Sequence, residues 1–190
     1  NGPVDRRRLI RRTYFDLIGL APTRDAVERF VSDPAPDAYE RLLSRLLASP
    51  HYGERWGRHW LDVARYGESH GYESDSERPT AWTYRDAVIR ALNEDLPFNR
   101  FVHWQLAGDL LQPERPLAVA LTGFITAGPT VTNVDGVDRE KAMYDKMDDI
   151  VASTGSAFLA LTVGCARCHD HKYDPIAQRD YYRLVGFFLP

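Results

Sequence analysis

Residues 52–66 read Tyr-Gly-Glu-Arg-Trp-Gly-Arg-His-Trp-Leu-Asp-Val-Ala-Arg-Tyr. Within this segment Trp56, Trp60 and Val63 recur at the three- and four-residue steps of an α-helix, which predicts an apolar stripe along one side. Polar side chains follow the same period on another face, namely Arg55, His59, Asp62 and Tyr66. The segment therefore predicts an amphipathic helix with a histidine on its polar face.

The same helical period continues on both sides of this segment, interrupted by Pro, Gly and Asp. Helices are expected at residues 5–18, 23–30 and 37–48 before it, and at residues 80–93, 98–110, 117–127, 138–163 and 178–188 after it. Residues 67–79 and 128–137 are polar and predict two long irregular loops. Neither a run of alternating apolar and polar residues nor an internal repeat is present. The expected fold is all-α.

Length and composition restrict the class of protein further. The chain has 190 residues, of which 44% are hydrophobic, and this suits one compact domain with a core. Its net charge of -3 gives no basic field for nucleic acid, and no apolar run is long enough to span a bilayer. The chain begins with Asn1 rather than Met, so we expect residues 1–190 to be a single domain excised from a larger multidomain protein.

Both cysteines lie in one short motif, Cys165-Ala166-Arg167-Cys168-His169. Two intervening residues place the thiols at the spacing of the two vinyl groups of haem, while the adjacent histidine can donate an imidazole nitrogen to the iron. The motif therefore predicts haem c, with thioethers at Cys165 and Cys168 and with His169 as an axial ligand.

Three other interpretations of the cysteine pair remain open. A zinc site could use Cys165, Cys168, His169 and His171, although zinc ligands usually come from two distant segments. A thioredoxin-like redox pair would be expected beside a βαβ unit, which the sequence does not predict. A structural disulfide between the two cysteines would close a very small loop and stabilise the fold little.

Three segments also resemble a known family, the planctomycete cytochrome-associated domain family, whose function is not established. They are LIRRTYFDLIGLAPT (residues 9–23), DAYERLLSRLLASPHYGERWGRHWLD (residues 37–62) and DDIVASTGSAFLALTVGCARCHDHKYDP (residues 148–175). Members are typically large exported proteins in which a cytochrome c domain often precedes this domain and another domain follows it. The resemblance implies a haem role, an extracytoplasmic location (periplasmic or cell-surface) and a neighbouring cytochrome or redox domain as partner.

A second axial ligand would complete a six-coordinate iron. His59 is the first candidate, because Trp56 could wall a flat cofactor and Arg55 could pair with a haem propionate. His70 is the second candidate. Met143 and Met147 are expected to pack in the core. Further arginines that could pair with propionates are Arg58, Arg65 and Arg167.

The sequence favours electron transfer by a covalent haem over an enzymatic role, but it does not decide between them. A haem enzyme, oxidative or peroxidatic, would need an open distal position beside acid or base groups. A haem-free binding or structural module of a surface or polysaccharide-associated protein is a third alternative, suggested by 12% aromatic residues. Residues 135–138, Asp-Gly-Val-Asp, are a weak candidate for calcium.

Overall fold

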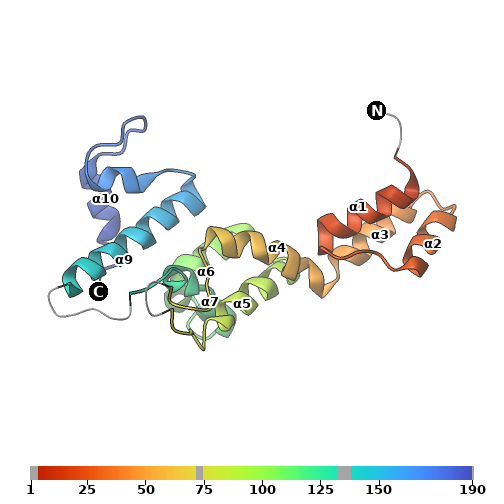
Figure 1. Ribbon diagram of the computed structural model, residues 1–190, viewed down its shortest axis with the longest axis horizontal. Coiled ribbons are helices and arrows are strands. Elements are labelled where there is room, and N and C mark those ends of the chain that lie inside the picture. Colours follow the sequence, from red (N-terminus) through yellow and green to blue (C-terminus); the bar gives the residue numbers. More distant parts are fainter. Residues whose placement is uncertain (1–3, 72–74, 132–137, 190) are drawn as a thin grey trace. The chain divides into compact units, whose positions relative to one another are not determined.

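The computed structural model describes residues 4–71, 75–131 and 138–189, and these residues form a helical fold (Figure 1). In these ranges the only β-pairing is one isolated antiparallel bridge between Ser69 and Glu77. The all-α prediction is confirmed. By its internal contacts the chain divides into two compact units, Asn1–Trp60 with Asp86–Pro97 and Leu61–Arg85 with Phe98–Pro190. The expectation of one haem domain over residues 1–190 stays a prediction.

Three helices open the first unit: α1 (Arg6–Ile18), α2 (Arg24–Ser32) and α3 (Ala38–Leu47). Gly19 ends α1 with a left-handed φ of 70°, a conformation that costs glycine little, and its amide donates to Phe15 O. The Thr23 hydroxyl caps α2 by accepting from Ala26 N at 3.2 Å. The three helices share one core, formed by Ile10, Ile18, Phe30, Ala38, Leu42 and Leu46.

The apolar stripe on α4 (Pro50–Val63) is largely not a core face, because Trp56 is 41% and Val63 49% exposed. The buried positions of α4 are instead Gly53 and Gly57. A Cβ at Gly53 would lie 2.4 Å from Ile89 O on α5 (Trp82–Asn93), so only glycine permits this backbone approach. Glycines at these positions therefore allow α4 and α5 to pack closely.

In the second unit, α6 (Phe98–Leu111) packs closely on α7 (Pro116–Leu121). A Cβ at Gly108 would lie 2.1 Å from Ala118 O, so glycine is needed where these helices meet. The single helix predicted for residues 117–127 is divided into α7 and α8 (Gly123–Thr126). Thr122 separates them, and both its amide and its hydroxyl donate to Val119 O, three residues earlier.

The C-terminal part of the second unit, cyan to blue in Figure 1, carries the cysteine motif. It consists of α9 (Arg139–Thr154), the π-helical turn η1 (Gly155–Leu159), the 3-10 turn η2 (Val163–Arg167) and α10 (Gln178–Val185). A second core joins these elements and contains Met147, Ile150, Val151, Val163, Ala166, Tyr181 and Val185.

Among the described residues, no helix is both long enough and apolar enough to cross a bilayer.

Candidate functional site

The chain enters the cysteine motif through a break in the helix, where the sequence predicted a helix to Val163 with a bend at Gly155 as an alternative. That prediction is wrong, because Ala160 adopts a left-handed φ of 54° and ends the π-helical turn. Leu161 N then donates back to Gly155 O at 3.2 Å. A Cβ at Gly155 would lie 2.5 Å from Val163 Cγ2, so glycine at this position lets the 3-10 turn fold back onto the end of α9.

The motif presents its reactive groups to solvent and buries its middle. Cys165 and Cys168 are exposed free thiols, and His169 is exposed as well. Ala166, between the cysteines, has no exposed surface and belongs to the second core. The turn is therefore anchored from beneath while both sulfurs and the imidazole face outward.

Arg167, the other residue between the cysteines, is fastened to α9. Its two terminal nitrogens donate to Asp145 Oδ1 and Asp148 Oδ2, each at 3.0 Å. Asp145 contributes most to raising the pKa of Arg167, and Lys141 followed by Arg167 lowers the pKa of Asp145. Tyr181 Oη donates to Asp148 Oδ1 at 2.5 Å, and burial followed by this bond raises the pKa of Tyr181.

The backbone of the same turn is held by α10. The carbonyl oxygen of Arg167 accepts hydrogen bonds from Gln178 Nε2 at 3.0 Å and from Tyr182 Oη at 3.1 Å. The amide of Gln178 in turn donates to Asp170 Oδ1 at 2.8 Å, so Asp170 caps the start of α10. The turn is thus fixed on both sides by helices of its own unit.

The geometry defines the tautomer of His169. Its Nδ1 lies 2.8 Å from the carbonyl oxygen of Asp170, which can only accept a hydrogen bond. Nδ1 therefore carries a proton, so that in the neutral imidazole the lone pair is on Nε2. An imidazole with a carbonyl on one nitrogen and a lone pair on the other is the usual form of a metal-ligating histidine.

His171, two residues further on, has both ring nitrogens engaged. Its Nδ1 accepts from the amides of Asp174 at 2.8 Å and Tyr173 at 3.3 Å, and its Nε2 lies 2.9 Å from Thr162 Oγ1. The side chain is 5% exposed. The lone pair on Nδ1 accepts hydrogen bonds within the protein, so His171 is not free to be the fourth ligand of the zinc site considered above. Within the described ranges no group of three or more His, Cys, Asp or Glu residues could hold a metal ion.

A family model for PSCyt2, protein of unknown function (DUF1549), matches residues 1–190. The chain belongs to this family. The result agrees with the family resemblance found in the sequence. Comparisons with the curated proteins and with the solved structures found no match.

The second axial ligand proposed for this PSCyt2 domain, His59, lies in the first unit, whereas the cysteine motif lies in the second. His59 is exposed and meets Trp56 edge to face, with 5.5 Å between ring centroids. Arg55 packs beside Gly19, with its Cδ 3.0 Å from the position of a Cβ there. The roles of His59, Trp56 and Arg55 toward haem stay predictions.

Other candidate ligands and partners lie in the second unit of the PSCyt2 domain. Met147 is 8% exposed and packs in the core, as expected, whereas Met143 is 38% exposed, so the expectation of core packing is wrong for Met143. Arg65, proposed as a propionate partner, is ion-paired with Asp149 at 2.7 Å. His70 has a buried Nδ1 without a hydrogen-bond partner, and its role stays a prediction. The candidate calcium residues 135–137 lie outside the described residues.

Sequence reasoning missed the residues that hold the turn in place. Asp145 and Asp148 lie one helical turn apart on α9, and the other two contacts come from Gln178 and Tyr182 on α10. The three-residue spacing of the aspartates places them on one helix face. No signal in the sequence identified Arg167 as the partner of both.

Proposed function

We propose that this PSCyt2 domain binds haem c covalently and transfers electrons outside the cytoplasm. Cys165 and Cys168 would form the two thioethers, and His169 would be an axial ligand. One observation carries the proposal: the thiols and the imidazole are exposed on one anchored turn, with the Nε2 lone pair of His169 free. The residues present therefore fit the group that the motif predicts.

Attachment needs no oxidant and no leaving group. Each thiol S–H adds across a vinyl C=C bond, so that one C–S bond and one C–H bond form. The exposed sulfurs meet the first requirement of this reaction, which is access to the thiols. The anchored Ala166 and Arg167 meet the second, because they hold the two cysteines at fixed spacing on one turn.

When bound, the haem supplies an iron that changes its oxidation state by one electron. The part played by the chain is positional. The Asp170 carbonyl orients His169, and the contacts of Arg167 with Asp145 and Asp148 hold the turn on α9. A neighbouring cytochrome or redox domain is the proposed electron partner, as the family resemblance implies. The proposed location is periplasmic or cell-surface, as the family resemblance implies, and both thiols must be reduced there when haem is delivered.

The test is covalent attachment. The chain is exported in a bacterial host with an active cytochrome c maturation system, the purified protein is extracted with acidified acetone, and the pyridine haemochrome spectrum is recorded. We expect an α-band at the c-type position to survive extraction. Cys165→Ser and Cys168→Ser should each shift this band toward that of haem with one free vinyl group, and the double variant should be colourless after extraction.

Three outcomes decide between the alternatives. A folded wild-type protein that is colourless after extraction would overturn the covalent-haem proposal. A covalent haem with a low-spin native spectrum would support electron transfer. A covalent haem with a high-spin spectrum and an exchangeable distal position would instead favour the haem enzyme.

A further inference from the structure

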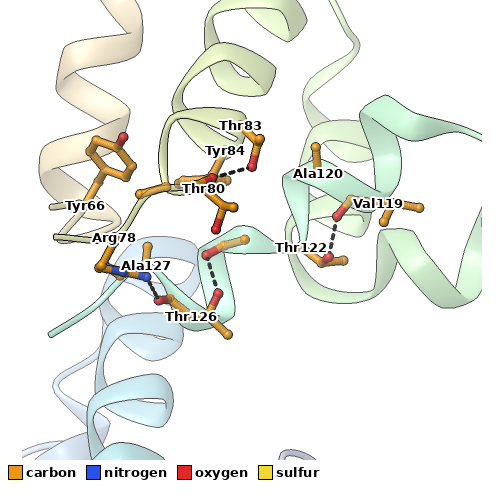
Figure 2. Close-up of a pocket in the computed structure, with 12 residues that line it drawn as sticks. Tyr66, Arg78, Thr80, Thr83, Tyr84, Val119, Ala120, Thr122, Thr126 and Ala127 are labelled. Atoms are coloured by element: carbon orange, nitrogen blue, oxygen red, sulfur yellow. Dashed lines mark hydrogen bonds between the residues drawn. The ribbon is translucent and has the colours of Figure 1, made fainter. Parts of the chain in front are cut away.

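The second unit contains a cavity of about 400 Å³ that shares no residue with the cysteine motif. Its volume lies within the range of small-molecule sites, roughly 300–1,000 Å³. Figure 2 shows side chains that converge on it from the turn after α4, from the loop and the start of α5, from α7 with the turn around Thr122, and from the end of α8. Most of the polar side chains of the lining carry a hydroxyl group, and they belong to Tyr66, Thr80, Thr83, Tyr84, Thr122 and Thr126.

Most of these hydroxyl groups already donate a hydrogen bond within the protein. Thr83 Oγ1 donates to Thr80 O at 2.8 Å, Thr122 Oγ1 to Val119 O at 2.5 Å and Thr126 Oγ1 to Gly123 O at 3.4 Å (Figure 2). A hydroxyl that donates keeps its oxygen lone pairs as acceptors. These three threonines therefore offer a ligand acceptors rather than donors.

Tyr66 behaves in the same way. Its Oη donates to Glu68 Oε1 at 3.1 Å. Burial, followed by the bond to Glu68, raises the pKa of Tyr66 to about 12, so the phenol stays protonated at neutral pH. The Glu68 carboxylate is engaged further by an ion pair with Arg85. The phenol oxygen of Tyr66 is thus a fourth acceptor on the lining.

Arg78 supplies the charge of the lining, yet its terminal nitrogens are occupied. Nη1 donates to Gly67 O at 3.3 Å and to Ala127 O at 2.7 Å, and Nη2 donates to Thr126 O at 2.5 Å. Among the residues that the structure describes, no carboxylate is paired with Arg78. Its positive charge consequently disfavours a cationic ligand, although few of its N–H groups are left to bind an anion.

The rest of the lining is apolar. The rings of Tyr66 and Tyr84 lie with their centroids 6.1 Å apart, and Ala81, Val119 and Ala120 complete this surface. Aromatic and methyl surfaces of this kind pack against C–H groups. A matching ligand therefore has many hydroxyl donors, carries no positive charge and has an apolar C–H face.

We propose that this hydroxyl-lined cavity binds a neutral saccharide of one or two sugar units, with the threonine and tyrosine oxygens accepting hydrogen bonds from the sugar hydroxyls. The site is independent of haem attachment, because it shares no side chain with the cysteine motif. It gives the domain a second, recognition function beside the proposed redox one.

Saturation-transfer NMR on the full 190-residue chain tests this, with glucose, galactose, maltose and cellobiose as probes. Glucosamine serves as the cationic comparison and glucuronate as the anionic one. The variant Thr83→Val with Thr122→Val removes two acceptors at constant shape. Thr13→Val is the matched control, because the Thr13 hydroxyl also donates to a backbone carbonyl, Leu9 O at 2.9 Å, but lies on α1, outside the cavity.

We expect at least one neutral sugar to bind with a millimolar dissociation constant or better. The double variant should weaken it about tenfold or more, as two lost hydrogen bonds imply, and the control should not. Near-ultraviolet circular dichroism confirms that each variant is folded. No signal from any neutral sugar, equal binding by the folded double variant, or tighter binding of glucosamine or glucuronate would each overturn the proposal.

Discussion

Arg167 Nη1 lies 3.0 Å from Asp148 Oδ2, and this ion pair fastens the middle of the cysteine motif to α9. The pair is partly exposed, so its contribution to stability is modest. Its position matters more, because Arg167 lies between Cys165 and Cys168, and the distance between these two thiols must match any group that bridges them. Removal of the pair is therefore expected to lower the yield of covalent haem as well as the free energy of unfolding.

The first prediction concerns this pair. Asp148→Asn removes the negative charge that pairs with Arg167 and weakens the hydrogen bond from Tyr181. The free energy of unfolding should therefore fall by about 1–2 kcal/mol in urea titrations. The yield of covalent haem should fall with it. Glu28→Gln is the control, because it breaks the fully exposed pair with Arg7 and should leave both measurements unchanged. Equal effects of the two variants would contradict the role given to Asp148.

The second prediction separates the two histidines near the motif. His169→Ala should leave the thioethers intact but change the native haem spectrum from low to high spin, because it removes the proposed axial lone pair. His171→Ala should keep the spin state and lower thermal stability, since both of its nitrogens bond within the protein. Visible spectra and thermal melts of the two purified variants provide the comparison. A change of spin state in His171→Ala alone would reverse the assignment.

The third prediction tests the close approach at the end of α9. Gly155→Ala would place a Cβ 2.5 Å from Val163 Cγ2 and should lower the free energy of unfolding by about 1–3 kcal/mol. Gly164→Ala is the matched control, because its Cβ would meet Ala152 Cβ at an ordinary 3.4 Å. Denaturant unfolding of both variants measures the difference. If Gly164→Ala proves the more harmful, the helix does not depend on Gly155 for this fold-back.

The fourth prediction is a stabilising substitution. Ala160 holds a left-handed φ of 54°, where a Cβ is strained and glycine is not. Ala160→Gly should therefore raise the free energy of unfolding by roughly 0.5–1 kcal/mol. Ala157→Gly, within the preceding π-helical turn, should lower it instead. Urea midpoints of the two variants should move in opposite directions.

The fifth prediction is a pH dependence. The pKa of Tyr66 is about 12 in the folded protein, above the value of about 10 for a free tyrosine. Because the folded pKa is the higher one, the stability from Tyr66 is complete below about pH 10 and is lost as the pH rises through 12. The phenolate absorbance of the wild type minus that of Tyr66→Phe should show a titration of Tyr66 near pH 12. Glu68→Gln should lower the pKa of Tyr66, and an unchanged pKa would rule out the bond to Glu68 as a cause.

The helices were predictable because their signals are local. The helix of Arg24–Ser32 follows a capping threonine, and the helix of Arg6–Ile18 ends before a glycine, both of which the sequence displays directly. The face of α4 was not predictable, because its packing depends on the carbonyl of Ile89, which is distant in sequence. Aromatic residues at helical spacing normally indicate a core face, and here two glycines take that place.

The candidate site was predictable only in its reactive atoms. The sequence displays Cys165, Cys168 and His169 together, and no structure is needed to group them. Gly155 was recognised as a possible bend of the helix. The end of the helical segment at Ala160 was missed, since an apolar run continues through Val163 and the left-handed turn at Ala160 has no residue signature. The anchors of Arg167 were missed because they come from two different helices.

The burial of Ala166 beneath two exposed thiols has a consequence for the biogenesis of the domain. The core under the motif consists of protein side chains, so on the function proposed above this part would fold before haem is attached. A newly exported chain would then pass through a folded intermediate with two reachable sulfurs. In an oxidising compartment, oxidation of the two thiols to a disulfide would compete with the attachment of haem. The supply of reductant would then determine the fraction of the domain that acquires haem.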